Sequence, residues 1–302
     1  MISLVTGGAG FIGSHLTDHL IKNGSKVIVL DNLSTGEEKN INPKADFIKG
    51  SIEKTDLEKI LLNVDFVFHA AALPRIQPSF DNPEEHDLAN VQNTLKVLKA
   101  AKSTQVKKII YSGSSSIYGN PSEVPTSENE KANPLNPYSL QKYTAEQYGL
   151  LLGKKWDIPF ISLRYFNPYG DRSFSKKNPL NAYSSVIGIF QNNYLKNETL
   201  KITGNGSQQR DFIHVSDISR ASVLLALSNE NLNFFNIGFG KAFAVLEIAK
   251  QISENYCFIP ARLGEADVTL SNNDKLMACI DWEPEIKVTE YLDNWKKNLK
   301  AK

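Results

Sequence analysis

Short apolar runs alternate with amphipathic segments along the first half of the chain. The runs have the length and composition of buried β-strands and cover residues 2–5, 26–30, 47–48, 64–69 and 106–112. Other segments repeat their apolar residues at helical spacing and predict helices at residues 53–63, 84–103 and 137–153. This alternation predicts an α/β fold built on a doubly wound parallel sheet with right-handed crossovers. Ligands of such sheets lie at the carboxyl ends of the strands.

A glycine-rich turn joins the first strand to the helix that follows it. Gly7, Gly8 and Gly10 lie in the turn, and Gly13 falls one turn into the helix. Such a turn lets the backbone approach a ligand and aims the N–H groups of the helix at a pyrophosphate, although many glycine turns are only tight connections. The second strand ends on Asp31, where an acid would hold a ribose 2′-hydroxyl and repel a 2′-phosphate. The turn and Asp31 together favour NAD over NADP.

Two further stretches are candidates to line the predicted NAD site. The polar turn after Asp31 is placed to wrap a ribose, and the small residues at 70–72 leave room for a flat dinucleotide. His69, at the end of the fourth strand, is expected to pack or to satisfy a hydrogen bond rather than to catalyse. Asn90 is expected either to contact the cofactor or to form only a local hydrogen bond, and the sequence leaves these alternatives equal.

Ser114, Tyr138 and Lys142 are the candidate chemical group. Pro137 opens a helix in which Tyr138 and Lys142 are one turn apart on the same face. We expect the ammonium of Lys142 to lower the pKa of the phenol, so that Tyr138 exchanges a proton with a substrate hydroxyl. Ser114 is expected to bind the same oxygen. Hydride transfer between an alcohol and a nicotinamide requires this proton exchange, so the pattern predicts an NAD-dependent enzyme.

The composition mainly excludes other classes of partner and site. The 302 residues suffice for one large domain or two fused ones, and the net charge of +1 does not indicate a nucleic-acid or membrane-surface partner. No leader peptide or membrane-spanning apolar stretch is evident, and Cys257 and Cys279 lack the spacing of a metal site. We expect a cytoplasmic protein without a bound metal. Only six of the 34 basic residues are arginine, which favours bidentate anion recognition at those positions.

Longer motifs add a family resemblance. The turn TGGAGFIG, Asp31, the serine-rich strand end GSSSIYG and the helix start YSLQK resemble the extended short-chain dehydrogenase/reductase superfamily. More narrowly, the chain resembles nucleotide-sugar epimerases of the UDP-glucose 4-epimerase type. The similarity covers essentially the whole chain and continues through RYFNPYG at 164–170, GNGSQQRDFIHVSDISRA at 204–221, FNIGFG at 235–240, ARLGE at 261–265 and DWEP at 281–284.

The resemblance implies a role for each residue of the site. Tyr138 would be the acid/base, Lys142 would bind the nicotinamide ribose, and Ser114 would share the sugar 4-hydroxyl. With the stretches named above, the predicted NAD site comprises Gly7, Gly10, Phe11, Ile12, Gly13, Asp31, Asn32, Ser34, Thr35, Gly36, Ser51, Ile52, Ala70, Ala71, Ala72, Asn90, Tyr138, Lys142 and Phe166. The predicted UDP-sugar site comprises Ser114, Tyr138, Asn167, Arg210, Arg262, Glu265 and Thr269.

Within that second site the resemblance distinguishes the roles further. Asn167 would hold the diphosphate, Arg210 and Arg262 would clamp its oxygens, and Glu265 would hold the uridine ribose. Arg164 is expected to form a structural ion pair instead. One departure concerns the cofactor: the family usually has Asp where this chain has Ser51, which weakens the expected adenine contact.

The reaction depends on the residues beside Ser114. Dehydratases of the superfamily carry Thr-Asp-Glu there, and UDP-glucuronate decarboxylases keep a Glu, whereas this chain has three serines at 114–116. Elimination is therefore disfavoured, and the sequence predicts NAD-dependent C4 epimerization of a UDP-hexose, UDP-glucose or UDP-galactose, through a 4-keto sugar. The alternatives are a 4,6-dehydratase, a decarboxylase or a 4-reductase and, more remotely, an NAD-binding sensor that catalyses nothing.

The residue at position 269 bears on the size of the sugar that the site accepts. In the family, a small residue seven positions after Arg262 goes with acceptance of N-acetylated sugars, and this position is Thr269. The segment NPLNAYSSVI at 178–187 also resembles members that handle N-acetylhexosamines. We therefore predict that UDP-GlcNAc and UDP-GalNAc are accepted as well.

The predicted organisation has two domains. Residues 1–165 would form an NAD-binding Rossmann domain, and residues 166–302 a smaller α/β domain for the nucleotide sugar. The chain is expected to return to the first domain around 205–240, with FIHV at 212–215 and FFNIG at 234–238 as added strands. The family resemblance implies a homodimer through the helices at 84–103 and 137–153. Leu150, Leu151 and Leu152 are candidate contacts, although a buried face within the chain explains them almost as well.

Overall fold

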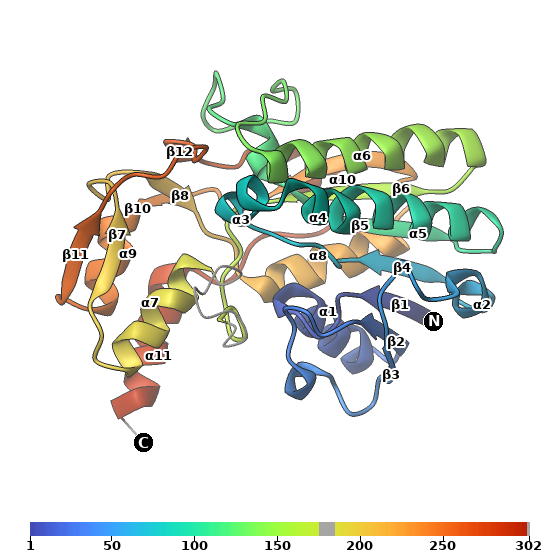
Figure 1. The fold of residues 1–302 in the computed structure, drawn as a ribbon, viewed down its shortest axis with the longest axis horizontal. Helices are drawn as coiled ribbons and strands as arrows, with labels where there is room; N and C mark the ends of the chain where they lie inside the picture. The colour runs from blue at the N-terminus through green and yellow to red at the C-terminus, as the bar shows by residue number, and fades with distance from the viewer. Residues whose placement is uncertain (175–184, 301–302) are drawn as a thin grey trace.

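A seven-stranded parallel sheet forms the centre of the protein (Figure 1). The computed structural model describes residues 1–174 and 185–300. The strand order β3-β2-β1-β4-β5-β6-β9 reverses between β1 and β4, which is where doubly wound folds bind ligands. The structure therefore confirms the predicted α/β class. The strands are β1 Ile2–Thr6, β2 Lys26–Asp31, β3 Asp46–Lys49, β4 Phe66–His69, β5 Lys108–Ser114, β6 Phe160–Tyr165 and β9 Leu232–Ile237.

Helices cover both faces of this sheet, because neighbouring strand residues point to opposite sides. On one face, α2, α5 and α6 pack against residues such as Leu4 and Ile109. On the other face, α1 and α8 pack against residues such as Val5 and Ile110. The helices on or near these faces are α1 Phe11–Lys22, α2 Leu57–Leu61, α3 Ile76–Asp81, α4 Pro83–Asp87, α5 Asn93–Lys102, α6 Pro137–Trp156, α8 Val215–Leu227 and α10 Asp274–Cys279.

Several element boundaries differ from the predicted ones. The helix predicted at 53–63 is only α2, which begins after Asp56 because the Asp56 carboxylate accepts the N–H of Lys59 at 3.2 Å. The helix predicted at 84–103 is interrupted by a π-helical turn, Leu88–Gln92. The fifth strand runs two residues further than predicted and ends on Ser114. Short 3₁₀ turns lie at Glu38–Asn40 and Ser115–Tyr118.

Two strands are expected from the sequence to return to the sheet, and one of these two predictions is wrong. FFNIG lies in β9, which pairs with β6, but FIHV does not form a strand of the sheet. The side chain of His214 instead accepts the N–H of Ser216 at 3.2 Å and caps α8, which begins at Val215. The apolar residues of FIHV are therefore buried in a turn and at the start of a helix. Four residues are too few for their hydrophobic pattern to distinguish this arrangement from a strand.

A second group of elements packs around its own apolar core beside the main sheet (Figure 1). It contains a three-stranded sheet, β10-β8-β12, and a two-stranded sheet, β11-β7. The predicted division into two domains at residue 165 stays a prediction, and residues 178–184 of NPLNAYSSVI lie outside the described residues. The elements are α7 Val186–Leu195, β7 Leu200–Thr203, β8 Gln209–Asp211, β10 Ala242–Ala244, α9 Val245–Ile252, β11 Tyr256–Ile259, β12 Val268–Thr269 and α11 Val288–Lys300.

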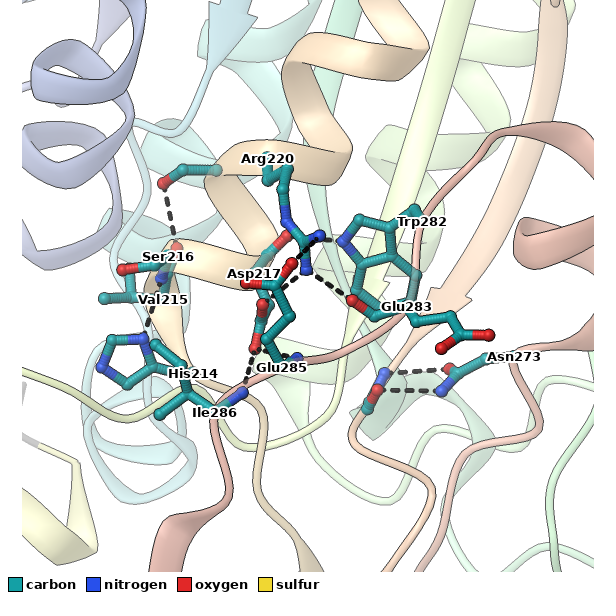
Figure 2. A network of polar contacts seen from close by, with 12 residues as sticks. His214, Val215, Ser216, Asp217, Arg220, Asn273, Trp282, Glu283, Glu285 and Ile286 are labelled. Atoms are coloured by element: carbon teal, nitrogen blue, oxygen red, sulfur yellow. Dashed lines mark hydrogen bonds and ion pairs between the residues drawn. The ribbon is translucent and has the colours of Figure 1, made fainter. Parts of the chain in front are cut away.

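A polar network attaches the DWEP segment to α8 (Figure 2). The buried carboxylate of Asp217 accepts the backbone N–H groups of Glu285 and Ile286, each at 3.2 Å, and the indole of Trp282 donates to the Asp217 carbonyl at 3.0 Å. Arg220 adds an ion pair with Asp217 at 2.8 Å. The motif therefore holds the last part of the chain, including α11, against a helix of the main sheet.

A buried ion pair connects α6 to β6. The guanidinium of Arg164 donates to both carboxylate oxygens of Glu146, at 2.6 and 3.0 Å, and to the hydroxyl of Tyr118 at 2.6 Å. Arg164 and Glu146 are 3% and 1% exposed, so neither charge has water to replace its partner. The expected structural ion pair of Arg164 is thereby confirmed. Within the described residues, none of the helices has the length and apolarity needed to cross a bilayer.

Removing one partner of this pair should destabilise the fold strongly. We expect Glu146→Gln to lower the free energy of unfolding by about 3 kcal/mol, because it leaves the Arg164 charge buried and uncompensated. Urea unfolding measures this change. The double variant Glu146→Leu/Arg164→Met, which removes both charges, should lie within about 1 kcal/mol of the wild type. An equal loss in both variants would contradict the assignment to an uncompensated charge.

Candidate active site

A cavity of about 1430 Å³ opens along the carboxyl ends of the central strands and continues to the second group of elements. It is lined by residues from the glycine turn, the ends of β2, β4 and β5, the start of α6 and the segment 262–269. All the residues predicted for the NAD and UDP-sugar sites line it except Asn90 and Phe166. Chain segments far apart in sequence thus meet at one site.

The glycine turn forms the floor of this cavity at the switch point of the sheet. A Cβ on Gly7, whose φ is +72°, would lie 2.7 Å from the backbone of Ala71, and a Cβ on Gly13 would lie 2.2 Å from the carbonyl oxygen of Gly7. Only glycine allows this close packing. Helix α1 then begins at Phe11 with no side-chain cap and no acidic residue in its first turn. The cavity wall is therefore suited to an anion such as a dinucleotide pyrophosphate.

Two further observations fit a dinucleotide at this end of the cavity. The carboxylate of Asp31 accepts the backbone N–H groups of Ala9 at 2.9 Å and Leu33 at 2.7 Å, which fixes it beside the turn. The hydroxyl of Ser51 is buried without a hydrogen-bond partner among the described residues, although it lines the cavity. A buried polar group of this kind needs a partner, and a purine ring can supply one.

Asn90 and Phe166 do not reach the cavity. The side chain of Asn90, 1% exposed, binds the N–H and carbonyl of Leu73 at 2.9 and 3.1 Å and the amide oxygen of Gln141 at 3.1 Å. Of the two expectations for Asn90, the local hydrogen bond is the one the structure shows. Phe166 packs against Tyr118 instead. His69 is buried between the hydroxyls of Thr6 and Thr94, at 2.7 and 3.0 Å, as expected for a packed histidine.

The three candidate catalytic residues lie together at the mouth of the central sheet. Ser114 ends β5, and its hydroxyl is 2.8 Å from the hydroxyl of Ser116. Tyr138 is the second residue of α6, and its backbone N–H donates to the hydroxyl of Ser79 at 3.1 Å. One turn later, the ammonium of Lys142 donates to the carbonyl of Ser112 at 2.8 Å. A cap at the start of α6 and the end of β5 therefore set their relative positions.

The electrostatics of this group differ from the expected ones. Burial raises the pKa of Tyr138, while a hydrogen bond to Ser114 and the charge of Arg75 lower it. Burial also lowers the pKa of Lys142 to about 7. The expectation that Lys142 lowers the pKa of Tyr138 is therefore not met in this structure. Burial is the largest cause of both shifts.

The residues predicted for the substrate diphosphate form a connected cluster. The side-chain amide of Asn167, whose φ is +39°, donates to the carbonyl of Asp211 at 2.8 Å and to the hydroxyl of Thr269 at 2.9 Å. Thr269 in β12 is also in register with Arg210 in β8. The nitrogens of Arg210 and Arg262 lie 3.6 and 3.9 Å from the Glu265 carboxylate. Two guanidinium groups thus share one carboxylate, and both line the cavity.

The sequence indicates that Asn136 and Pro137 open α6, but it does not indicate the contact of Asn136 with a distant loop. Its side-chain oxygen accepts the N–H of Ser139 at 2.9 Å and caps α6, and its side-chain nitrogen donates to the carbonyl of Gly264 at 2.9 Å. Nearby, Gln77 donates to the carbonyl of Leu263 at 3.2 Å. Asn136 therefore joins the helix that carries Tyr138 to the loop that carries Arg262 and Glu265. A residue preceding Pro at a helix start signals the cap, but the loop contact depends on tertiary structure.

Comparison with known proteins assigns the family. Residues 3–238 match the model of the NAD-dependent epimerase/dehydratase family, so the chain belongs to this family, whose cofactor is NAD. A putative UDP-glucose 4-epimerase of Methanocaldococcus jannaschii is 40% identical over 98% of each chain. The UDP-glucose 4-epimerase of Thermotoga maritima, solved with UDP-glucose, has a TM-score of 0.92 at 33% identity and covers 99% of this chain and 100% of its own.

A further solved structure differs in its sugar. The UDP-N-acetylglucosamine 4-epimerase of Methanobrevibacter ruminantium, in complex with UDP-N-acetylmuramic acid, has a TM-score of 0.89 at 34% identity. The match covers 96% of this chain and 95% of that one. Proteins similar to this chain over nearly their whole length therefore carry names with different sugars, and the family alone does not specify the substrate.

The pKa of Lys142 predicts how stability depends on pH. Because that pKa lies near 7 in the folded protein and near 10.5 in the unfolded chain, folding is favoured progressively as the pH rises from 7 to 10. Lys142→Met removes the penalty, so the variant should be more stable than the wild type at pH 7 by a few kcal/mol, and this difference should shrink toward pH 10.

Denaturant unfolding at several pH values measures this difference. Lys154→Met, which changes an exposed lysine of the same helix, is the matched control and should not change the pH dependence. A constant difference between Lys142→Met and the wild type from pH 7 to 10 would contradict the lowered pKa.

Proposed function

We propose that this protein catalyses NAD-dependent C4 epimerization of a UDP-hexose through a 4-keto sugar. The observation that carries the proposal is the position of Ser114, Tyr138 and Lys142 at the wall of one cavity that also contains the glycine turn and the Arg210–Arg262 cluster. A dinucleotide at the turn and a diphosphate at the arginines would place a sugar between them, next to Tyr138. Family membership supports the same assignment.

In the proposed mechanism the protein positions the sugar and moves one proton. NAD, held by the glycine turn, Asp31 and Lys142, would supply the acceptor and donor of hydride for sugar C4. As the phenolate, Tyr138 would take the proton of the 4-hydroxyl as the C4 carbonyl forms, and as the phenol it would give that proton back when the carbonyl is reduced. Ser114 donates a hydrogen bond to the same oxygen, which carries partial negative charge during the transfer. Arg210 and Arg262 would hold the diphosphate while the 4-keto sugar rotates in the site to present its opposite face.

Epimerization is favoured over the other reactions considered. A 4,6-dehydratase or decarboxylase would need a carboxylate next to the catalytic serine, whereas residues 115 and 116 are serines and Ser116 is occupied with Ser114. A sensor would not require Ser114, Tyr138 and Lys142 at one wall. A 4-reductase has the same residues and is distinguished only by its products.

Acceptance of N-acetylated sugars remains a prediction that depends on Thr269. Thr269 is a small residue that lines the cavity, and its hydroxyl accepts a hydrogen bond from Asn167 that holds the side chain in place. We propose that it leaves room for an acetamido group.

A homodimer through α5 and α6 is also proposed. Leu151 is 66% exposed on α6, whereas Leu150 and Leu152 pack against the core beneath and are not available for such an interface. Exposed Leu140 and Tyr148 lie on the same helix and extend the apolar surface. The cytoplasmic location stays a prediction.

Product analysis without added cofactor tests the proposed reaction. Purified protein is incubated separately with UDP-glucose, UDP-GlcNAc, UDP-glucuronate and dTDP-glucose, and the products are identified by NMR. We expect the C4 epimer of at least one UDP-sugar, and Tyr138→Phe should lower kcat by about 10²–10⁴-fold because it removes the acid/base. A 4-keto-6-deoxy or pentose product would contradict epimerization. Bound NAD without any turnover would favour the sensor.

Asn136 provides a second test, because its two hydrogen bonds can be separated. Asn136→Asp keeps the cap of α6 but replaces the donor to Gly264 with a negative oxygen. We expect KM for the UDP-sugar to rise about five- to tenfold, and more than kcat falls, because the loop that carries Arg262 is released. Asn136→Ala loses both bonds and should in addition lose about 1 kcal/mol of stability. Lower stability of Asn136→Asp with an unchanged KM would show a purely structural role.

A further inference from the structure

Arg75 is a half-buried cation at the cavity wall to which the proposed mechanism gives no role. It follows the small residues at the end of β4 and lines the cavity immediately before α3. Its Nε is buried without a hydrogen-bond partner, and no ion pair to its guanidinium is found in the part of the chain that the structure describes. Its φ of +102° is a conformation that side chains with a Cβ rarely adopt.

The backbone conformation and the surroundings together indicate a function. A strained, non-glycine residue persists only where neighbouring structure holds it, and such residues gather at ligand sites. Two contacts hold this segment: the Ser79 hydroxyl accepts the N–H of Tyr138, and the Gln77 amide donates to the Leu263 carbonyl. The segment that presents Arg75 is thus fixed to the catalytic helix on one side and to the substrate loop on the other.

The contacts of the segment that follows Arg75 locate it along the proposed substrate. Ser79 contacts the backbone of Tyr138, and Gln77 contacts the backbone of Leu263, next to Arg262. Burial lowers the pKa of Arg75, and Tyr138, Arg262 and Glu265 are near enough to influence that pKa. Arg75 therefore lies between the phenol proposed to act on the 4-hydroxyl and the arginine pair proposed to hold the diphosphate. The part of a UDP-sugar that lies between those two points is the sugar ring with its substituents.

The missing partner of Arg75 is best supplied by an anion. The buried Nε of this half-buried guanidinium lacks a hydrogen-bond acceptor, and a neutral sugar hydroxyl could satisfy that donor without compensating the charge. A carboxylate matches the planar fork of arginine with two parallel hydrogen bonds. Glu265, the nearby carboxylate, already lies within 4 Å of both Arg210 and Arg262.

We propose that Arg75 binds a carboxylate carried by the sugar of the substrate, so that this protein prefers an acidic UDP-sugar, such as a UDP-hexuronate, to a neutral UDP-hexose. This inference rests on the proposed function and names the substrate class of the same site. In a hexuronate the carboxylate is attached to C5, next to the reacting C4. The pairing with Arg75 would therefore hold the ring close to Tyr138.

Kinetic comparison of two sugars tests the proposal. For the purified wild-type protein we expect kcat/KM for UDP-glucuronate to exceed that for UDP-glucose by about tenfold or more. Arg75→Met should lower this ratio by about tenfold or more, and Arg75→Lys should lower it less, because it keeps the charge but loses the bidentate geometry. Arg262→Met is the matched control, and it should lower kcat/KM for both sugars alike.

Calorimetry with UDP alone separates the sugar from the diphosphate. Arg75→Met should bind UDP with a Kd within about twofold of the wild type, whereas Arg262→Met should bind it more weakly. An equal loss for both sugars together with weaker UDP binding in Arg75→Met would identify a third diphosphate ligand and overturn the proposal. A wild-type preference for UDP-glucose would also overturn it.

Failure of the proposed reaction and failure of the Arg75 proposal give different results in two measurements. Absence of a C4 epimer from every UDP-sugar would refute the epimerase, but calorimetric competition between UDP-glucuronate and UDP-glucose would still decide whether Arg75 selects a carboxylate. Thermal unfolding controls for misfolding. Arg75→Met removes an unpaired, half-buried charge and should be at least as stable as the wild type. A folded variant that retains the full preference for UDP-glucuronate would contradict the proposal.

Discussion

The close packing of the glycine turn against the end of β4 is the constraint on which the rest of the site depends. Gly7 touches the backbone of Ala71, and Gly13 touches the carbonyl of Gly7, at distances that exclude any side chain. This packing brings the uncapped start of α1 to the point where the strand order reverses. A parallel sheet leaves its ligand crevice at that point, so the cavity and its anion-binding end follow from two backbone contacts.

Desolvation is the second effect that shapes the site. It makes the charged forms of three side chains unfavourable, and a bound ligand would reduce that penalty. Burial shifts the pKa of Tyr138 upward and those of Lys142 and Arg75 downward, in each case against the charged form. Each of the three residues lines the same cavity. The site is therefore a region where charge is held in poorly solvated surroundings, which strengthens electrostatic interactions with a bound anion or a developing oxyanion.

Coupling between the two groups of elements depends on a few polar contacts. Asn136 connects the start of α6 to the loop of Arg262, and Asp217 connects α8 to the segment that precedes α11. Both use a buried side chain to bind backbone groups of a distant segment, which fixes position without requiring a particular residue there. The substrate-side arginines are thus held in place relative to Tyr138 by contacts outside the chemistry itself.

The sequence by itself determined the fold class, the glycine turn with Asp31, and the set of side chains at the catalytic wall, because these depend on local periodicity and on spacing within single elements. It placed Arg164 in an ion pair and His69 in the interior for the same reason. Tertiary structure alone decided that Asn90 turns away toward Leu73, that FIHV ends in a helix cap, and that Arg75 stands without a partner beside Tyr138. Those outcomes depend on which distant groups compete for a hydrogen bond or exclude water, and a linear pattern does not contain that information.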